Sequence, residues 1–310
     1  MREIHNVMII GLGALGTIYA ERLSNCPDVQ ISVIVDQARK DRYEANGIWY
    51  NDKRYDFHYI LPSEEWPAAD LILLATKSSG LASAMEMIAP FVGEDTILMS
   101  LMNGISSERL LAERFGAHHV LYALFYGHMG MNVDGKISHD GVNQTFFGEA
   151  DNRTISTRVA ACRDLFEKAG LAYVVPDDMI HALWQKYMII LAFNQLAALF
   201  QEDYTPFKVS PTAMSLARHI MDEAAQVAAA LGVDQAEALP AETEEVVARL
   251  PADLVPSIRQ DYMMHRQMEV DIFSGELCRL GRELGIPTPY NDAVRDILTA
   301  MNEKNSLTQP

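Results

Sequence analysis

The sequence predicts an α/β protein of two domains: a parallel-sheet domain over residues 1–176 and an all-helical domain over residues 177–310. Three observations support this prediction. Short apolar runs alternate with helical patterns through the first half of the chain, as in βαβ units that build a parallel sheet. The pattern changes after about His118. From Asp177 onward the apolar spacing is helical, and no segment has the pattern of a strand.

Four apolar runs predict the main strands, and amphipathic stretches between them predict helices. The strands are Asn6–Ile10, Gln30–Val35, Asp70–Ala75 and Thr96–Ser100. The helices are Thr17–Asn25, Gly80–Ala89 and Ser107–Phe115. Because the strands are apolar along almost their whole length, we expect helices to cover both faces of the sheet.

Shorter elements complete the first domain. The predicted strands are Val120–Phe125, Lys136–His139, Gln144–Phe147 and Ala172–Val175, with a helix at Thr154–Ala169. Asp140-Gly141 separates the two middle strands, which suits an antiparallel pair. We place the domain boundary at Pro176, directly after the last strand.

The second domain is predicted to contain five helices. They are Asp177–Leu199, Pro211–Leu231, Glu242–Leu250, Pro256–Leu284 and Asn291–Met301. Acidic residues in the first turn favour the start of the first helix, and Gly232 ends the second. The tail Asn302–Pro310 is polar, so we expect it to fray.

Charge and composition exclude several classes of function. The 310 residues include 42 Asp and Glu against 25 Lys and Arg, for a net charge of −17. This surplus argues against nucleic acid and against anionic membrane surfaces, since both bind through Lys and Arg. Cys26, Cys162 and Cys278 form no CxxC pair and no zinc-type cluster, so we predict reduced core thiols and no metal. The absence of a signal peptide and of a membrane-length apolar run predicts a cytoplasmic protein.

The sharpest motif is the glycine-rich turn between the first predicted strand and helix. It consists of Gly11, Leu12, Gly13, Ala14, Leu15 and Gly16. The first glycine permits a tight turn, the second lets the backbone approach a pyrophosphate, and the third lets the helix pack closely against the strand. The helix N-terminus then offers N–H groups to phosphate. The motif therefore predicts a Rossmann-type dinucleotide site that binds NAD or NADP.

Asp36 stands at the end of the second predicted strand, 20 residues after Gly16. A dinucleotide fold places the acid that binds the ribose hydroxyls at this distance. Such an acid repels a 2′-phosphate and so favours NAD. The plainer alternative is a solvated loop acid, and Arg39, Lys40 and Arg42 lie near enough in sequence to meet a phosphate.

Over nearly its whole length the chain resembles the ketopantoate reductases, or 2-dehydropantoate 2-reductases. The matching pieces are Gly11–Gly16, Ala75-Thr-Lys77, Met102-Asn-Gly104, His139–Gly148, Leu183-Trp-Gln-Lys186 with Asn194, and Ser257 with Glu269. Their order and spacing together make the resemblance specific. It implies a Rossmann-type N-terminal domain, an all-helical C-terminal domain and a role in pantothenate biosynthesis.

The resemblance also implies a role for each matching residue. Lys186 is the expected general acid, and Glu269 would hold or tune its ammonium group. Asn103, Asn194 and Ser257 are expected to bind substrate, with Asn103 also meeting the cofactor, and Lys77 lies near the cofactor. Taken alone, these residues have plainer interpretations: a solvated lysine, an ion-pair acid, a helix cap at Ser257 and a strand-end charge at Lys77.

The spacing of Lys186 and Asn194 is compatible with a shared site. Eight residues on one α-helix place them ~80° apart around the axis and ~12 Å apart along it. Both side chains can then line one stripe of the helix. Asn194 lies within an apolar run, and a buried amide there requires a partner.

Two positions depart from the family pattern. Ile190 stands where the family usually has a second Asn, and Asp36 stands where it usually has an Arg for the NADP phosphate. Isoleucine forms no hydrogen bond, so discrimination for a substrate hydroxyl is weakened. The leading hypothesis is reduction of a small 2-keto acid, first ketopantoate. The alternatives are an NAD-dependent D-2-hydroxyacid dehydrogenase for branched or aromatic acids and a non-catalytic dinucleotide sensor. The oligomeric state is open, a homodimer included.

Overall fold

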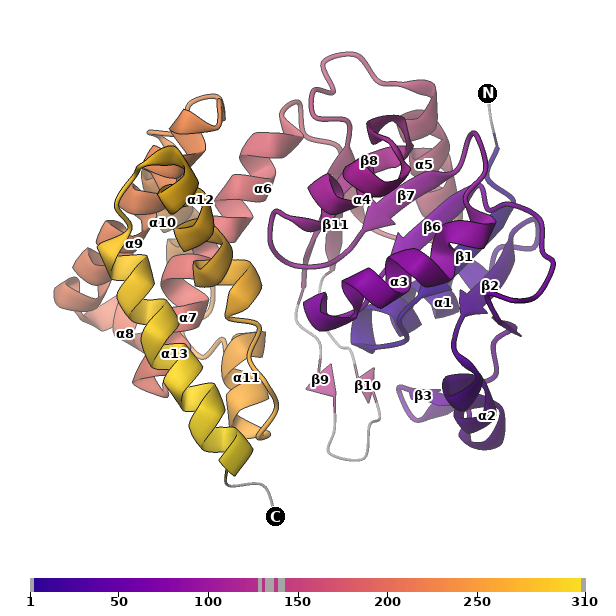
Figure 1. Ribbon diagram of the computed structural model, residues 1–310, viewed down its shortest axis with the longest axis horizontal. Coiled ribbons are helices and arrows are strands. Elements are labelled where there is room, and N and C mark those ends of the chain that lie inside the picture. Colours follow the sequence, from indigo (N-terminus) through magenta and orange to yellow (C-terminus); the bar gives the residue numbers. More distant parts are fainter. Residues whose placement is uncertain (1–2, 128–129, 132–136, 139–142, 308–310) are drawn as a thin grey trace. The chain divides into compact units, whose positions relative to one another are not determined.

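The computed structural model describes residues 3–127, 130–131, 137–138 and 143–307. Its internal contacts divide the chain into two compact units (Figure 1). The first unit comprises Met1–Asn103 and Ser107–Met179, and the second comprises Gly104–Ser106 and Ile180–Pro310. The division between the sheet-containing and helical parts of the chain therefore falls at Met179, three residues after Pro176.

An eight-stranded sheet forms the centre of the first unit. Its spatial order is β12 (Tyr173–Val174), β11 (Gln144–Gly148), β8 (Val120–Tyr126), β7 (Ile97–Ser100), β6 (Leu71–Leu74), β1 (Asn6–Ile10), β2 (Gln30–Ile34) and β5 (Tyr59–Ile60). The six strands from β8 to β5 are parallel. Their chain order across the sheet is that of a dinucleotide-binding Rossmann fold. The predicted parallel-sheet domain is confirmed.

Alternate residues of β1 enter different cores, because successive side chains of a strand point to opposite faces. Val7 and Ile9 pack on the face covered by α1 (Ala14–Ser24) and α5 (Thr157–Lys168). Met8 and Ile10 pack on the face covered by α3 (Leu81–Ile88) and α4 (Ser107–Phe115). The expectation of a sheet buried on both faces is correct.

A separate small sheet contains elements that the sequence pattern misplaced. Its order is β4 (Lys53–Tyr55), β3 (Ile48–Tyr50), β10 (Ile137–Ser138) and β9 (Gly130–Met131). The proposed antiparallel pairing of the strands at 136–139 and 144–147 is wrong, since β10 pairs with β3 and β9 while β11 pairs with β8. The physical reason is burial of Ile137 against Ile18 and Tyr50. Lys136 and residues 139–142 lie outside the described residues.

The described part of the second unit consists of helices, which confirms the predicted all-helical domain. They are α6 (Met179–Met188), α7 (Gln195–Phe200), α8 (Thr205–Val209), α9 (Pro211–Ala230), α10 (Leu239–Arg249), α11 (Ser257–Met263), α12 (Glu276–Leu284) and α13 (Pro289–Leu307). None of the helices in the described ranges combines the length and the apolarity that crossing a membrane requires.

Two predicted long helices are interrupted by π-helical segments. One is Ile189–Asn194, between α6 and α7, and the other is Asp271–Gly275, before α12. The first helix also starts later than predicted, at Met179, so its first turn contains no acid. The backbone of Asp178 instead forms an isolated antiparallel β-bridge with Asp151 in the first unit.

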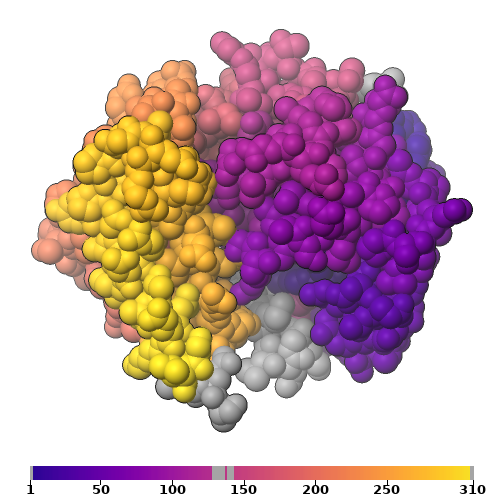
Figure 2. Space-filling view, viewed as in Figure 1, coloured from indigo at the N-terminus to yellow at the C-terminus, as the bar shows by residue number. Residues whose placement is uncertain are grey.

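The C-terminal tail is helical through Leu307, so the expectation of fraying from Asn302 is wrong. Figure 2 shows these last residues in yellow at the surface of the second unit. The Asn302 side chain accepts from Met268 N at 3.0 Å and donates to Met268 O at 3.0 Å. Asn305 donates to the backbone oxygen of Tyr262 at 3.4 Å. These bonds connect the last helix to the segment that precedes Glu269.

The three cysteines are free thiols buried in the cores, as predicted. Burial raises the pKa of the Cys278 thiol to about 11 and also raises that of Cys26. A thiol in such an environment is a packing group with little thiolate at neutral pH.

Candidate active site

The candidate cofactor residues of the first unit follow four adjacent parallel strands. The glycine turn follows β1, Asp36 follows β2, Lys77 follows β6 and Asn103 follows β7. The carboxyl ends of parallel strands lie at one edge of a sheet, so these four loops share that edge. Chain order reverses between β1 and β6, and open α/β sheets bind their ligands outside the strand ends at such a switch point.

Two glycines of the turn are required by close packing. Gly11 has φ +96°, and a Cβ there would lie 2.6 Å from the Ala75 carbonyl oxygen at the end of β6. A Cβ on Gly16 would lie 1.9 Å from the Gly11 carbonyl oxygen. The turn and the first turn of α1 can therefore close against β6 only without these side chains.

Gly13 has a different environment. A Cβ built there meets no atom within 4 Å, and Gly13 is the N-cap of α1 without a side-chain capping bond. The first N–H groups of α1 therefore have no side-chain cap, and an uncapped helix N-terminus beside an open Gly13 position fits a pyrophosphate. Between the glycines, Leu12 and Leu15 pack against one core of the sheet and Ala14 against the Ile18 cluster. These side chains anchor the turn.

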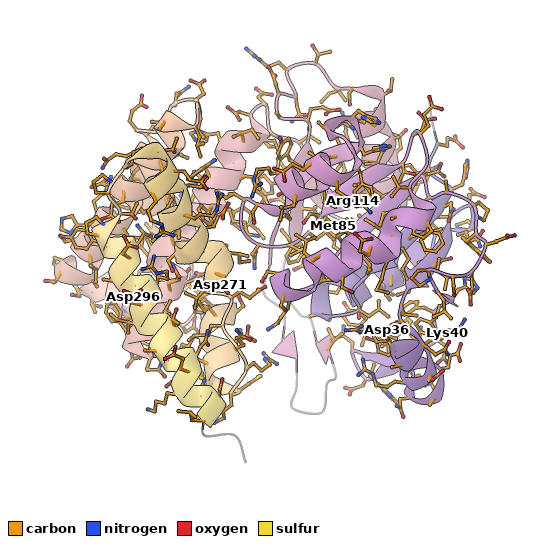
Figure 3. The ribbon with its side chains drawn as sticks, in the orientation of Figure 1. Asp36, Lys40, Met85, Arg114, Asp271 and Asp296 are labelled. Atoms are coloured by element: carbon orange, nitrogen blue, oxygen red, sulfur yellow. The ribbon has the colours of Figure 1, made fainter. Side chains whose placement is uncertain are left out.

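Asp36 is the N-cap of α2 (Gln37–Asn46), where Figure 3 labels it beside Lys40. Its carboxylate accepts from the Arg39 backbone N–H at 2.7 Å and from the Arg39 guanidinium, and its side chain is 44% exposed. Asp36 is thus a helix cap, and this assigns a structural role to the acid. A carboxylate offers about four acceptor positions, so capacity remains for ribose hydroxyls.

The basic residues near Asp36 also have partners within the protein. Lys40 forms an ion pair with Glu64 at 2.9 Å, and the Arg42 guanidinium lies 4.9 Å from the centre of the Tyr43 ring. Each of the three cationic side chains near Asp36, those of Arg39, Lys40 and Arg42, therefore contacts another group of the protein. A 2′-phosphate would have to compete with these contacts.

The loops after β6 and β7 approach each other. The Thr76 hydroxyl donates to the Met102 sulfur at 3.7 Å, which places the residues before Lys77 and Asn103 side by side. Lys77 is exposed and precedes a short 3₁₀ turn, Ser78–Gly80. Asn103 is half-buried, and the chain turns at Gly104 with φ +99°.

In the second unit, Lys186 lies half-buried near the end of α6, and Asn194 is the last residue of the π segment that follows. The Asn194 amide oxygen accepts from the buried Tyr204 hydroxyl, which is the partner that the amide requires. No pattern in the sequence points to Tyr204, since no spacing rule links it to Asn194. The ~80° separation assumed a continuous α-helix, and the π segment between the two residues invalidates that figure.

Ser257 begins α11, and Glu269 follows the end of that helix. Glu269 is half-buried and follows Met268, the residue bound by Asn302. Ser257 is exposed and is the first residue of α11, whose N-cap is Pro256 with no side-chain capping bond. The helix-cap interpretation of Ser257 is therefore wrong. Ile190 is buried within the first π segment.

Comparison with known protein families covers both units. Residues 7–152 match the sequence model described as Ketopantoate reductase PanE/ApbA. Residues 178–302 match the model described as Ketopantoate reductase PanE/ApbA C terminal. The chain belongs to the ketopantoate reductase family. It is accordingly an NAD(P)-dependent oxidoreductase. The matches also include residues 139–142, whose structure lies outside the described ranges.

Individual relatives share the architecture. The 2-dehydropantoate 2-reductase of Mesorhizobium japonicum is 27% identical over 314 residues, covering 93% of this chain and 95% of that protein. A D-mandelate dehydrogenase solved with NADH and anilino(oxo)acetate has a TM-score of 0.84 at 22% identity, covering 97% of this chain and 99% of its own. A ketopantoate reductase from Ralstonia eutropha JMP134 has a TM-score of 0.81 at 24% identity, with the same coverage. At these identities the two structures establish the fold.

Proposed function

We propose that the protein reduces a small 2-keto acid with NADH or NADPH and that ketopantoate is the first substrate to test. The observation that carries this proposal is the match of both units to one reductase family, at 7–152 and 178–302. The cofactor loops lie in the first match, and Lys186 and Glu269 lie in the second.

The step assigned to the residues of this chain is the transfer of a proton to the carbonyl oxygen of the substrate. The bound cofactor supplies a hydride to the carbonyl carbon, and the carbonyl oxygen gains negative charge as the C=O π bond breaks. The ammonium of Lys186 stabilises that oxygen by hydrogen bonding and then donates its proton, which yields a hydroxyl and a neutral amine. Water restores the ammonium. Glu269 orients or tunes the lysine.

The remaining candidate residues are assigned to binding of the cofactor or the substrate. Gly11–Gly16, Asp36 and Lys77 are assigned to the cofactor, Asn194 and Ser257 to the substrate, and Asn103 to both. The capping of α2 by Asp36 and the internal partners of Arg39, Lys40 and Arg42 support NAD over NADP.

A second candidate is an NAD-dependent D-2-hydroxyacid dehydrogenase for branched or aromatic 2-keto acids. The apolar, buried Ile190 in the segment between Lys186 and Asn194 favours it, because that position has no group to bind a substrate hydroxyl. The likeness to a D-mandelate dehydrogenase, solved with NADH, points the same way.

The deciding experiment is oxidation of NADH and of NADPH, followed by absorbance, against a panel of 2-keto acids. The panel contains ketopantoate, 2-ketoisovalerate and benzoylformate. Highest kcat/KM with ketopantoate supports the first candidate, and highest kcat/KM with an acid lacking the terminal hydroxyl supports the second. The absence of turnover with every acid would contradict both and favour the sensor hypothesis.

A further inference from the structure

Both residues assigned to proton transfer lie within three residues of the start of a π-helical segment. The segment Ile189–Asn194 begins three residues after Lys186, and the segment Asp271–Gly275 begins two residues after Glu269. Figure 3 labels Asp271 at the start of the second one. Isolated π turns are rare, and they occur frequently at functional sites. Two of them beside two candidate residues require an explanation.

The first connection between the segments is made by Tyr187, the neighbour of Lys186. Its side chain is 1% exposed, and its hydroxyl donates to the backbone oxygen of Phe273 at 2.7 Å. Phe273 lies within the second segment, at φ −103° and ψ −108°, where the helical path is kinked. Burial raises the pKa of Tyr187 well above its ordinary value, so the hydroxyl remains a donor at neutral pH.

The second connection is a bond between two side chains. The Ser274 hydroxyl donates to the Gln195 amide oxygen at 2.9 Å, and both residues are 0% exposed. The Gln195 amide nitrogen donates to the Leu191 oxygen at 3.1 Å, while its backbone N–H donates to the Ile190 oxygen five residues back. Gln195 thus closes the end of the first π segment with its backbone and binds the second segment with its side chain.

These bonds join the same two stretches of chain at two points. We propose that Tyr187 and the Gln195–Ser274 pair are positioning residues that set the placement of Lys186 relative to Glu269 by holding the two π segments together. The proposal rests on the proposed function of those two residues. Buried hydrogen bonds between neutral groups are directional, and a misplacement of ~1 Å can cost about 100-fold in rate.

Tyr187→Phe removes one hydroxyl and retains the ring. We expect kcat at saturating 2-keto acid to fall about 10- to 100-fold, while the Kd for the reduced cofactor, measured by its fluorescence, changes less than about twofold. The primary isotope effect with cofactor deuterated at the transferred position should increase, because the chemical step becomes rate-limiting. Tyr19→Phe is the matched control, since Tyr19 is also 1% exposed and its hydroxyl has one buried partner, Thr145.

The second pair separates positioning from stability. Ser274→Ala leaves the buried Gln195 amide oxygen without its donor, so both stability and kcat should fall. Adding Gln195→Met removes the stranded polar group at similar volume, so Tm should recover while kcat remains low. Recovery of kcat together with Tm would show a purely structural role and overturn the proposal.

Equal kcat in Tyr187→Phe and Tyr19→Phe would also overturn it. If Tyr187→Phe does not fold, the Ser274 and Gln195 variants decide the same question. Failure of the proposed function has a different signature. In that case Lys186→Ala retains turnover, whatever the Tyr187 and Ser274 variants do.

Discussion

The strand-end loops of the first unit and the π segments of the second unit present functional groups in different ways. The glycine turn offers backbone N–H groups from one short run of the chain, Gly11 to Gly16, which packs against Ala75 at the end of β6. The π segments place side chains through bonds between distant residues, such as Tyr187 with Phe273. In the proposed assignment, phosphate binding therefore depends mainly on one short run of the chain, whereas placement of the proposed proton donor depends on bonds between distant residues.

The largest expected effect separates these two regions. Lys186→Ala removes the proposed proton donor, and we expect kcat to fall about 10²- to 10⁴-fold, the range for loss of a general acid. The Kd for reduced cofactor should remain nearly unchanged, because the phosphates are proposed to bind backbone groups of the first unit. Steady-state kinetics and cofactor fluorescence titration measure both quantities.

Lys304→Ala on the exposed side of α13 is the control for removing a positive charge from the second unit. Its kcat should match that of the unmodified protein. A Lys186→Ala protein with comparable turnover would eliminate the proposed mechanism. A large loss of cofactor affinity in that variant would instead remove the distinction between the two regions.

Within the glycine turn, two substitutions test which backbone positions pack and which bind. Gly16→Ala places a methyl group against the Gly11 carbonyl, so we expect a loss of at least about 3 kcal/mol in the free energy of unfolding. Gly13→Ala meets open space at φ −76° and ψ −167°, which alanine adopts readily, so stability should be retained. Urea unfolding gives both values.

The same Gly13→Ala protein should bind reduced cofactor about tenfold more weakly, because its methyl group projects where the pyrophosphate approaches. Full affinity in a folded Gly13→Ala protein would indicate that the phosphates do not contact this part of α1.

The contrast also explains which features the sequence could predict. Strands β1, β2, β6 and β7 and the turn between β1 and α1 follow from local apolar runs and glycine spacing. The π segments do not, because one extra residue per turn leaves the run Tyr187–Leu199 just as apolar. The helical tail was missed because Asn302 is polar in sequence yet bound to Met268. The partner of Ile137 was missed because it lies in β3, far back in the chain.

Asp36 has two roles, since it caps α2 and is proposed to bind a cofactor ribose. Asp36→Ser keeps an oxygen for the Arg39 backbone N–H but removes the charge and one acceptor. We expect helix stability to change by less than about 0.5 kcal/mol and the kcat/KM preference for NADH over NADPH to fall about tenfold. Asp36→Arg should shift the preference further. Equal or better use of NADPH by the unmodified protein would refute the assignment.

The smallest expected effect concerns acid, which distinguishes one ionic contact of the first unit from the neutral hydrogen bonds that join the two π segments. Burial of Glu149 alone would raise its pKa, but hydrogen bonds from Arg158 and Ser156 outweigh this and lower it. A carboxyl with a depressed pKa contributes stability above its unfolded pKa of about 4.3, and this contribution is lost as the pH falls through the folded value. Replacing Glu149 with Gln should therefore lower the free energy of unfolding by about 1 kcal/mol at pH 7, and the difference in Tm should disappear at the acid end of a pH titration.

The bonds of Tyr187 and of the Gln195–Ser274 pair involve no group that titrates in acid. A difference in Tm between Ser274→Ala and the unmodified protein should therefore stay constant over the same pH range. If that difference also vanished in acid, the connection between the two π segments would itself depend on a carboxylate, and its description as a pair of neutral hydrogen bonds would fail.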